Sequence, residues 1–167
     1  QGAKIIWSDI NFNTRVAMSN NQKITASSFA GTWRLADAYA ETDAGRQPFP
    51  LGEGTQGLII YDERGFMSAQ LMSADRTRLS VRNLDDVPLD EFKTAYLGYT
   101  SYFGRFSLNA AENTVTHHVE GSLAAGWVGG DQLRYFEFVD DNLVLKTPPI
   151  RVADGSKVVN TLIWARA

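Results

Sequence analysis

His117 and His118 are the residues best suited to acid–base chemistry, because an imidazole titrates near neutral pH. They are neighbours in a run of strand character, where adjacent side chains point to opposite faces, so the pair cannot readily hold one metal ion. His117 shares its face with Val115 and Val119, which predicts that His117 points inward and His118 outward. Three interpretations of His117 stay open: a hydrogen-bonded structural histidine, an acid, base or donor to a bound carbonyl, and a haem ligand.

Two arginines could assist such chemistry. Arg105 and Arg134 are each flanked by aromatic residues, and a guanidinium in such a place could hydrogen-bond an anionic or enolised ligand. The alternative is that they pair with Glu120 or Glu137. The candidate catalytic residues are therefore His117, Arg105 and Arg134.

Six polar or aromatic residues are candidates for ligand contact, because they fall near predicted strand ends or carry rings that suit an apolar guest. They are Tyr39, Gln70, Tyr99, Trp127, Tyr135 and Asn160. Trp127 lies between Gly126 and Gly129, which is typical of a mobile gate.

Other chemistries are disfavoured. The chain has no cysteine, which excludes disulfides, thiolate metal sites and a cysteine nucleophile. No G-x-S-x-G motif occurs. Residues 52–57 match G-x-G-x-x-G, but a strand-like run follows them where a dinucleotide site needs a helix. We therefore expect no metal and no cofactor.

The composition of the chain limits the classes of molecule that it is expected to bind. A chain of 167 residues with 44% hydrophobic and 21% charged residues is expected to form one globular domain. The net charge of −3 gives no basic surface for nucleic acid, and no apolar run is long enough for a membrane helix. Without cysteine or an N-x-S/T glycosylation site, a cytoplasmic location is favoured. The expected partner is a small molecule, and the sequence leaves the oligomeric state open.

The elements that must position these residues are eight strands with turn residues between them. The predicted strands are Thr32–Tyr39, Leu58–Tyr61, Phe66–Met72, Arg105–Leu108, Thr114–Glu120, Gln132–Val139, Leu143–Lys146 and Val158–Ala165. The connections alternate between long and short, starting with a long one. In an up-and-down antiparallel barrel this alternation places the tight turns at one end and the long loops at the other. The sequence thus predicts an all-β barrel with a closed end and a mouth, large enough for one small ligand.

One helix is expected between the third and fourth strands. Acidic residues around Pro88 favour a helix start, and apolar residues then recur at helical spacing. This stripe comprises Leu89, Phe92, Tyr96, Tyr99 and Phe103. It predicts a helix that packs onto the sheet.

The sequence resembles the lipocalins at both ends of this barrel. Residues 31–35 (GTWRL) are similar to the G-x-W opening of that superfamily, whose tryptophan plugs the closed end beneath an arginine near the last strand's end. Trp33 and Arg166 take these positions, and barrel closure would make their strands neighbours. A cation–π contact between them is therefore expected.

A narrower resemblance is to the single-domain lipocalin-like family of bacterial and fungal proteins. It is carried, between Phe29 and Ala167, by segments that include GFMSAQ, YFGRF, THHVEGS, WVG, TPP and LIW. It implies a barrel domain over residues 29–167 after an extension at 1–28, whose part before Met18 is either native or vector-derived. The family offers no agreed catalytic residues to carry over.

Two functions remain as hypotheses. Some similar barrels act as cofactor-free cyclases or isomerases in secondary metabolism, so the resemblance implies catalysis on a polyketide- or terpenoid-like substrate. The alternative is a non-catalytic protein that binds and carries an apolar metabolite.

Overall fold

The structure is a computed structural model that describes residues 24–167. Most of the expected extension at 1–28 therefore lies outside the described residues. The helices and short 3₁₀ turns are α1 (Ala26–Phe29), η2 (Leu84–Asp86), α2 (Leu89–Leu97) and η3 (Ala125–Trp127). The strands are β1 (Gly31–Thr42), β2 (Gly45–Pro48), β3 (Gln56–Tyr61), β4 (Phe66–Met72), β5 (Tyr99–Asn109), β6 (Thr114–Ser122), β7 (Asp131–Val139), β8 (Asn142–Lys146), β9 (Ile150–Arg151) and β10 (Lys157–Arg166).

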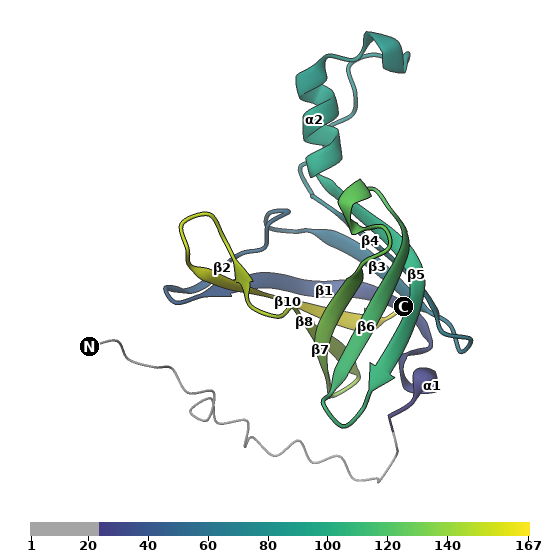
Figure 1. The fold of residues 1–167 in the computed structure, drawn as a ribbon. Coiled ribbons are helices and arrows are strands. Elements are labelled where there is room, and N and C mark those ends of the chain that lie inside the picture. The colour runs from purple at the N-terminus through teal and green to yellow at the C-terminus, as the bar shows by residue number, and fades with distance from the viewer. Residues whose placement is uncertain (1–23) are drawn as a thin grey trace.

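The eight predicted strands form a closed antiparallel barrel (Figure 1). Each strand pairs with the next around the ring, and β1 pairs with β10 over eight residue pairs that close it. The additional strands β2 and β9 extend the sheet beside β1 and β10. Closure removes the free edges that an open sheet would expose to other chains.

The two ends of the barrel differ as the connection lengths predicted. Tight turns join β3 to β4, β5 to β6 and β7 to β8 at the end where α1 lies. Residues Asn113 and Asp140 in two of these turns have positive φ angles of 51° and 53°, which asparagine and aspartate tolerate better than most residues. The long connections, with α2 and η3, lie at the other end.

The closed end is filled by aromatic side chains. Phe29 of α1 is fully buried, and its ring packs edge-on against Tyr61, Phe136 and Phe138 at centroid distances of 5.0–5.5 Å. The expected contact is present: the guanidinium carbon of Arg166 lies 4.2 Å from the centroid of the Trp33 ring. Arg166 also donates hydrogen bonds to the carbonyl oxygens of Ser28 and Ala30.

A β-bulge in β1 changes which residues face inward. The pairing with β10 shifts between Leu35 and Asp37, so that Ala38 and Ala40 follow Trp33 and Leu35 on the inner face. Strict alternation from Trp33 would turn Asp37 and Tyr39 inward, and the bulge reverses this, so the candidate ligand contact Tyr39 does not face the interior. Both lie on the outer face, where Arg46 pairs with the Asp37 carboxylate at 2.7 Å and covers the Tyr39 ring at 3.7 Å.

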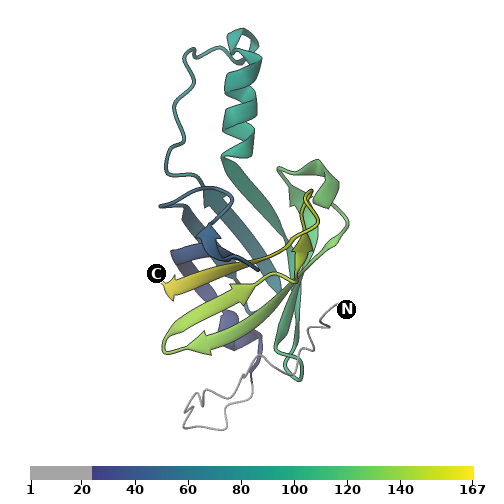
Figure 2. The same cartoon turned by 90° about the vertical axis from the view of Figure 1, so that its left-hand side faces the viewer.

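The helix α2 does not pack onto the sheet, contrary to the prediction. It ends at Leu97 before Gly98, so Tyr99 and Phe103 of the apolar stripe belong to β5. Figures 1 and 2 show that α2 projects beyond the ends of β4 and β5, where no barrel wall is available to cover it. Leu89 is 85% exposed as a result. Within residues 24–167, no helix has the length and apolar character needed to cross a membrane.

Candidate functional site

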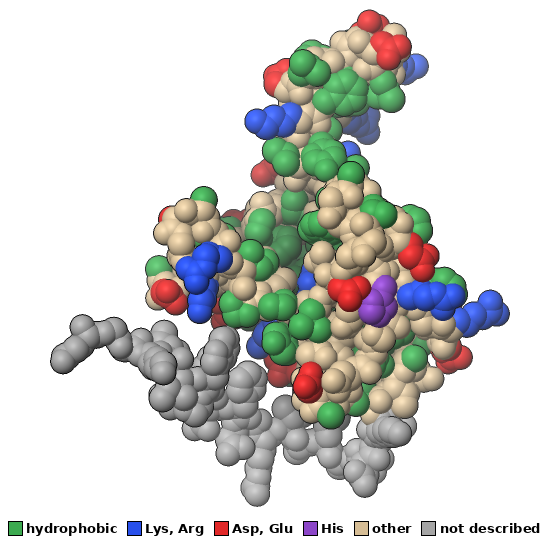
Figure 3. Space-filling model, viewed as in Figure 1, with side chains coloured by type: hydrophobic (Ala, Val, Ile, Leu, Met, Phe, Trp, Pro, Cys, Tyr) green, Lys and Arg blue, Asp and Glu red, His purple; other side chains and the backbone are tan. Residues whose placement is uncertain are grey.

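A cavity of about 590 Å³ occupies the mouth half of the barrel. Its lining divides into two walls. Strands β3 and β4 and the loop before them contribute apolar side chains, among them Phe49, Leu51, Ile59, Ala69 and Leu71. The part of the chain from β5 to β10 contributes all the polar lining residues, among them Tyr102, His117, Arg134, Thr147 and Asn160, together with further apolar ones such as Leu145 and Leu162. In Figure 3, hydrophobic side chains are seen in the hollow beside the barrel strands and along the projecting α2.

His117 lies inside the barrel, as predicted, and is held between two tyrosines. It is 1% exposed. Its Nε2 lies 2.7 Å from the hydroxyl of Tyr61 on β3, and its Nδ1 lies 3.0 Å from the hydroxyl of Tyr102 on β5. Tyr61 is buried behind the histidine, whereas Tyr102 lines the cavity.

The three side chains form a hydrogen-bonded chain, Tyr61–His117–Tyr102, and their partners fix which group donates to which. Among residues 24–167, the only partner of the buried Tyr61 hydroxyl is Nε2 of His117, so Tyr61 donates its proton there. Neutral imidazole carries one N–H, which must then be at Nδ1 and donate to the Tyr102 oxygen. The hydroxyl hydrogen of Tyr102 is left free to point into the cavity.

Burial keeps all three groups of this chain uncharged at neutral pH. Burial, with smaller contributions from the charges of Arg134 and His118, lowers the pKa of His117 from 6.5 to about 3. Burial raises the pKa of Tyr61 well above its ordinary value and raises that of Tyr102, although the positive charge of Arg134 works in the opposite direction at both. The arrangement can therefore donate a hydrogen bond to a ligand, but it offers no strong base.

Arg134 also points into the cavity, on the same inner face of β7 as the buried Phe136. Its guanidinium donates to the backbone oxygen of Leu133 at 2.7 Å and to Oε1 of Gln132 at 3.3 Å. The pairing with Glu137 that the sequence left open is absent, because Glu137 lies 3.3 Å from Lys146 on the outer face.

Two further polar groups reach the cavity wall from β10. The Oδ1 atom of Asn160 and the Nε1 atom of Trp164 are buried, and neither has a hydrogen-bond partner among the described residues. Asn160 also lies beside Thr147, whose hydroxyl accepts a hydrogen bond from the Asn160 backbone N–H at 3.0 Å. This wall therefore has hydrogen-bonding capacity that the protein itself does not use.

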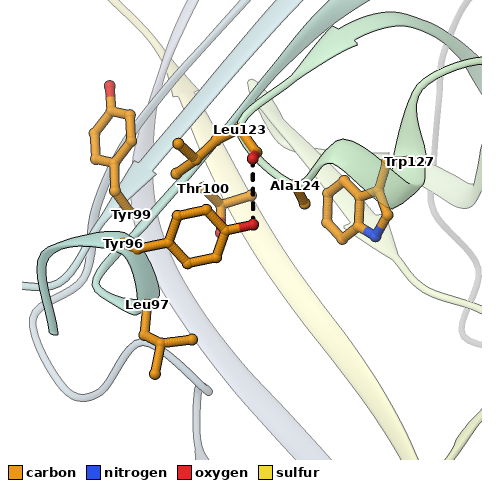
Figure 4. Close-up of a pocket in the computed structure, with 7 residues that line it drawn as sticks. All are labelled: Tyr96, Leu97, Tyr99, Thr100, Leu123, Ala124 and Trp127. Atoms are coloured by element: carbon orange, nitrogen blue, oxygen red, sulfur yellow. Dashed lines mark hydrogen bonds between the residues drawn. The ribbon is translucent and has the colours of Figure 1, made fainter. Parts of the chain in front are cut away.

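Trp127 of η3 stands at the mouth between two hollows. Its ring packs edge-on against Tyr102, with centroids 5.7 Å apart, and it lines the large cavity. On its other side is a smaller hollow of about 140 Å³, which the end of α2 and the start of β5 complete (Figure 4). There the Tyr96 hydroxyl donates to the backbone oxygen of Leu123 at 3.2 Å, which ties α2 to the η3 loop.

The remaining predicted ligand contacts lie elsewhere. Gln70 alternates with Ala69 and Leu71, which line the cavity, so it is on the outer face and donates to the Ser68 hydroxyl. Tyr135, 46% exposed, is on the outer face of β7. Tyr99 lines the small hollow at the mouth, where Arg76 stacks on its ring at 5.0 Å.

Arg105 and His118 are on the outside of the barrel. Arg105 lies 3.9 Å from the Glu120 carboxylate and stacks on the Phe66 ring at 4.2 Å, so its pairing with Glu120 is the structural role that the sequence left open. His118 is outside as predicted, with Nδ1 2.7 Å from an Asp131 carboxylate oxygen and Nε2 2.9 Å from the Ser107 hydroxyl. Residues 24–167 contain no cluster of three or more histidine, aspartate or glutamate side chains suited to a metal ion.

Sequence reasoning did not select Tyr61, Tyr102 or Trp164 as site residues. Tyr61 is two residues after the inward-facing Ile59, and Trp164 is two residues after Leu162, so each shares the inner face of its strand. Counting every second residue along these strands could have placed both side chains inside. Their contacts with His117 and the cavity depend on strand pairing across the barrel, which no local pattern reveals.

Comparison with known proteins agrees with the architecture. No curated protein matches the chain. The family model of the lipocalin-like domain matches residues 30–167, which are the whole barrel from the start of β1 to the last residue. A barrel of this family with a cavity at its mouth supports ligand binding. The chain belongs to the family of lipocalin-like domains.

Proposed function

We propose that the barrel binds a small, largely apolar and partly oxygenated molecule in its cavity, and that it acts on this molecule as a cofactor-free cyclase or isomerase. Its substrate would be of polyketide or terpenoid type. The observation that carries the proposal is the chain Tyr61–His117–Tyr102, which ends at a free hydroxyl hydrogen in a cavity of about 590 Å³.

The chemistry proposed for this hydroxyl is activation of a ligand carbonyl. Hydrogen bonds in a chain polarise one another, so the Tyr61 and His117 donors make the Tyr102 O–H a better donor than an isolated phenol. A hydrogen bond to an enone oxygen draws electron density from the conjugated alkene. This favours bond formation with an electron-rich diene in the same molecule. No atom is gained or lost in such a cyclisation, so it needs neither a base nor a co-reactant.

The second contribution is conformational. The apolar wall, which includes Ile59, Ala69 and Leu71, would hold a flexible hydrocarbon chain folded while its carbonyl contacts Tyr102. Holding the reacting ends together removes much of the entropic cost of cyclisation. In this proposal Tyr102 contacts the substrate, and His117 is a positioning residue that acts through Tyr102.

Binding is tested with prodan, a naphthalene dye with one ketone, whose emission shifts to the red when the carbonyl accepts a hydrogen bond. We expect prodan to bind the wild-type protein, and we expect its bound emission to shift to the blue in Tyr102→Phe. Tyr135→Phe removes a hydroxyl from the outer face and is the matched control, with unchanged emission. Failure of prodan to bind, or equal emission in wild type and Tyr102→Phe, would contradict the binding mode.

Catalysis is tested with a linear trienone, a diene tethered to an enone, which cyclises slowly without an enzyme. We expect the wild-type protein to raise its rate at least about ten-fold, which corresponds to about 1.4 kcal/mol of barrier. Tyr102→Phe should lose most of this increase, and His117→Gln should lose part of it. Binding without acceleration would instead support the non-catalytic carrier, and would reject the cyclase half of the proposal.

A further inference from the structure

We infer that the cavity takes its ligand as an organic acid in its anionic form, with the carboxylate on Arg134 and the apolar body against the wall formed by β3 and β4. This inference rests on the proposed binding function and names the chemical class of the ligand.

The first observation is that Arg134 brings a positive charge into the barrel without a counter-charge. The two groups to which it donates hydrogen bonds, the Leu133 carbonyl and the Gln132 side-chain amide, are neutral, and so is the nearby Tyr102 hydroxyl. In the part of the chain that the structure describes, four ion pairs are formed and Arg134 is in none of them. Arg134 is partly buried, so its charge is less well hydrated than on an open surface, and an anion at this place would be favoured.

The second observation is that no side chain of the cavity wall can supply that anion. Of the lining residues, only Arg134 and Asp131 are charged. The Asp131 carboxylate is 63% exposed and bonds to Nδ1 of His118 on the outer face of the barrel. Arg134 is thus the one charged group that this cavity offers to a ligand.

The third observation is the unused polar capacity on the same wall. Trp164 is 2% exposed, and its Nε1–H lacks an acceptor among residues 24–167, as the Asn160 Oδ1 lacks a donor. Arg134 precedes Tyr135, which pairs with Lys146 of β8. Thr147 comes directly after β8, and its hydroxyl accepts a hydrogen bond from the backbone N–H of Asn160 on β10. Polar groups therefore reach the cavity from β7, from the residue after β8 and from β10, whereas every lining residue of β3 and β4 is apolar.

These observations together describe an amphipathic ligand. A guanidinium presents a planar set of donors that matches the two oxygens of a carboxylate. A neutral ligand of the same shape would leave the Arg134 charge unpaired, so the cavity should discriminate strongly between an acid and its amide.

The test uses N-phenylnaphthylamine, a neutral dye that fluoresces in apolar cavities, and displaces it with naphthylacetic acid or with naphthylacetamide. These competitors have nearly the same shape, and only the acid is charged at pH 7.5. We expect the acid to bind the wild-type protein at least about ten-fold more tightly than the amide. In Arg134→Gln this ratio should fall to near one, whereas Arg134→Lys should keep part of it.

The matched control is Arg105→Gln, which removes an arginine from the outer face of the adjacent wall and should keep the full preference for the acid. Each affinity is calculated from that variant's own affinity for the dye, so a general change in the cavity does not affect the ratio. Absence of dye binding in the wild type would reject the proposed binding function. Dye binding with equal affinities for acid and amide, or a preference that survives Arg134→Gln, would reject the anionic ligand alone.

Discussion

The two ends of this barrel are made by the same strands but are filled in opposite ways. At the closed end, Phe29, Trp33 and their aromatic neighbours pack against one another, and the polar atoms of Trp33 and Arg166 are hydrogen-bonded to backbone oxygens. Toward the mouth, about 590 Å³ is left open, and the buried Asn160 Oδ1 and Trp164 Nε1 on its wall have no hydrogen-bond partner within residues 24–167. The difference indicates that stability is concentrated at the closed end, and that the mouth is free to serve a ligand.

The largest loss of stability is expected when the tryptophan of the closed end is removed. Trp33 is 1% exposed and its Nε1 donates to the Phe29 carbonyl at 2.8 Å, so Trp33→Ala should lower the free energy of unfolding by about 3–5 kcal/mol. Trp127→Ala at the mouth is the comparison and should cost less than half as much. Denaturant unfolding measures both, and equal losses would remove the distinction between the ends.

The buried histidine between the ends should make stability depend on pH. The unfolded chain binds a proton at His117 with a pKa near 6.5, whereas the folded protein does so only near 3. The stabilisation from neutral His117 is therefore complete above pH 6.5 and is lost as the pH falls toward 3. The loss is about 1.4 kcal/mol per pH unit, or about 3 kcal/mol at pH 4.5.

His117→Gln should remove this part of the pH dependence, because glutamine does not titrate. The adjacent His118→Gln is the control and should keep it, since His118 lies on the outer face. The measurement is the difference in unfolding free energy between pH 7 and pH 4.5 for the three proteins. The same slope in wild type and His117→Gln would contradict the burial of a neutral imidazole.

A smaller loss of stability is expected when Arg166, which covers Trp33 at the closed end, is changed. Arg166→Gln removes the cation–π contact with Trp33 and weakens the hydrogen bonds to Ser28 and Ala30, which should lower stability by about 1–2 kcal/mol. Prodan affinity should not change, because Arg166 lies at the opposite end of the barrel from the mouth. A loss of affinity would show that the two ends are coupled.

The smallest change in stability is expected in α2, which projects beyond the mouth. Leu89 of α2 is 85% exposed, so Leu89→Ser should change the unfolding free energy by less than about 0.5 kcal/mol. A cost above 1 kcal/mol in thermal or denaturant unfolding would indicate that α2 packs more closely than the structure has it.

The sequence was sufficient for the ring of strands, its two ends and the inward direction of His117, because period-two alternation and turn residues are local properties. The Trp33–Arg166 contact could also be predicted, since barrel closure makes β1 and β10 neighbours whatever the register. Tyr39 could not be placed, because the bulge after Leu35 leaves no clear mark in the sequence. The partners of His117 are 56 and 15 residues away, so they depend on the exact strand register.

The hydrogen on Nδ1 of His117 lies between a buried ring and the Tyr102 oxygen. Such a hydrogen exchanges slowly with bulk water, so its proton resonance should be visible in an NMR spectrum at neutral pH. Because Tyr102 borders the cavity, a guest that takes up the free hydroxyl hydrogen would shift this resonance. The His117 Nδ1 proton resonance can therefore report whether the cavity is occupied, and it can be used to screen compounds before any substrate is known.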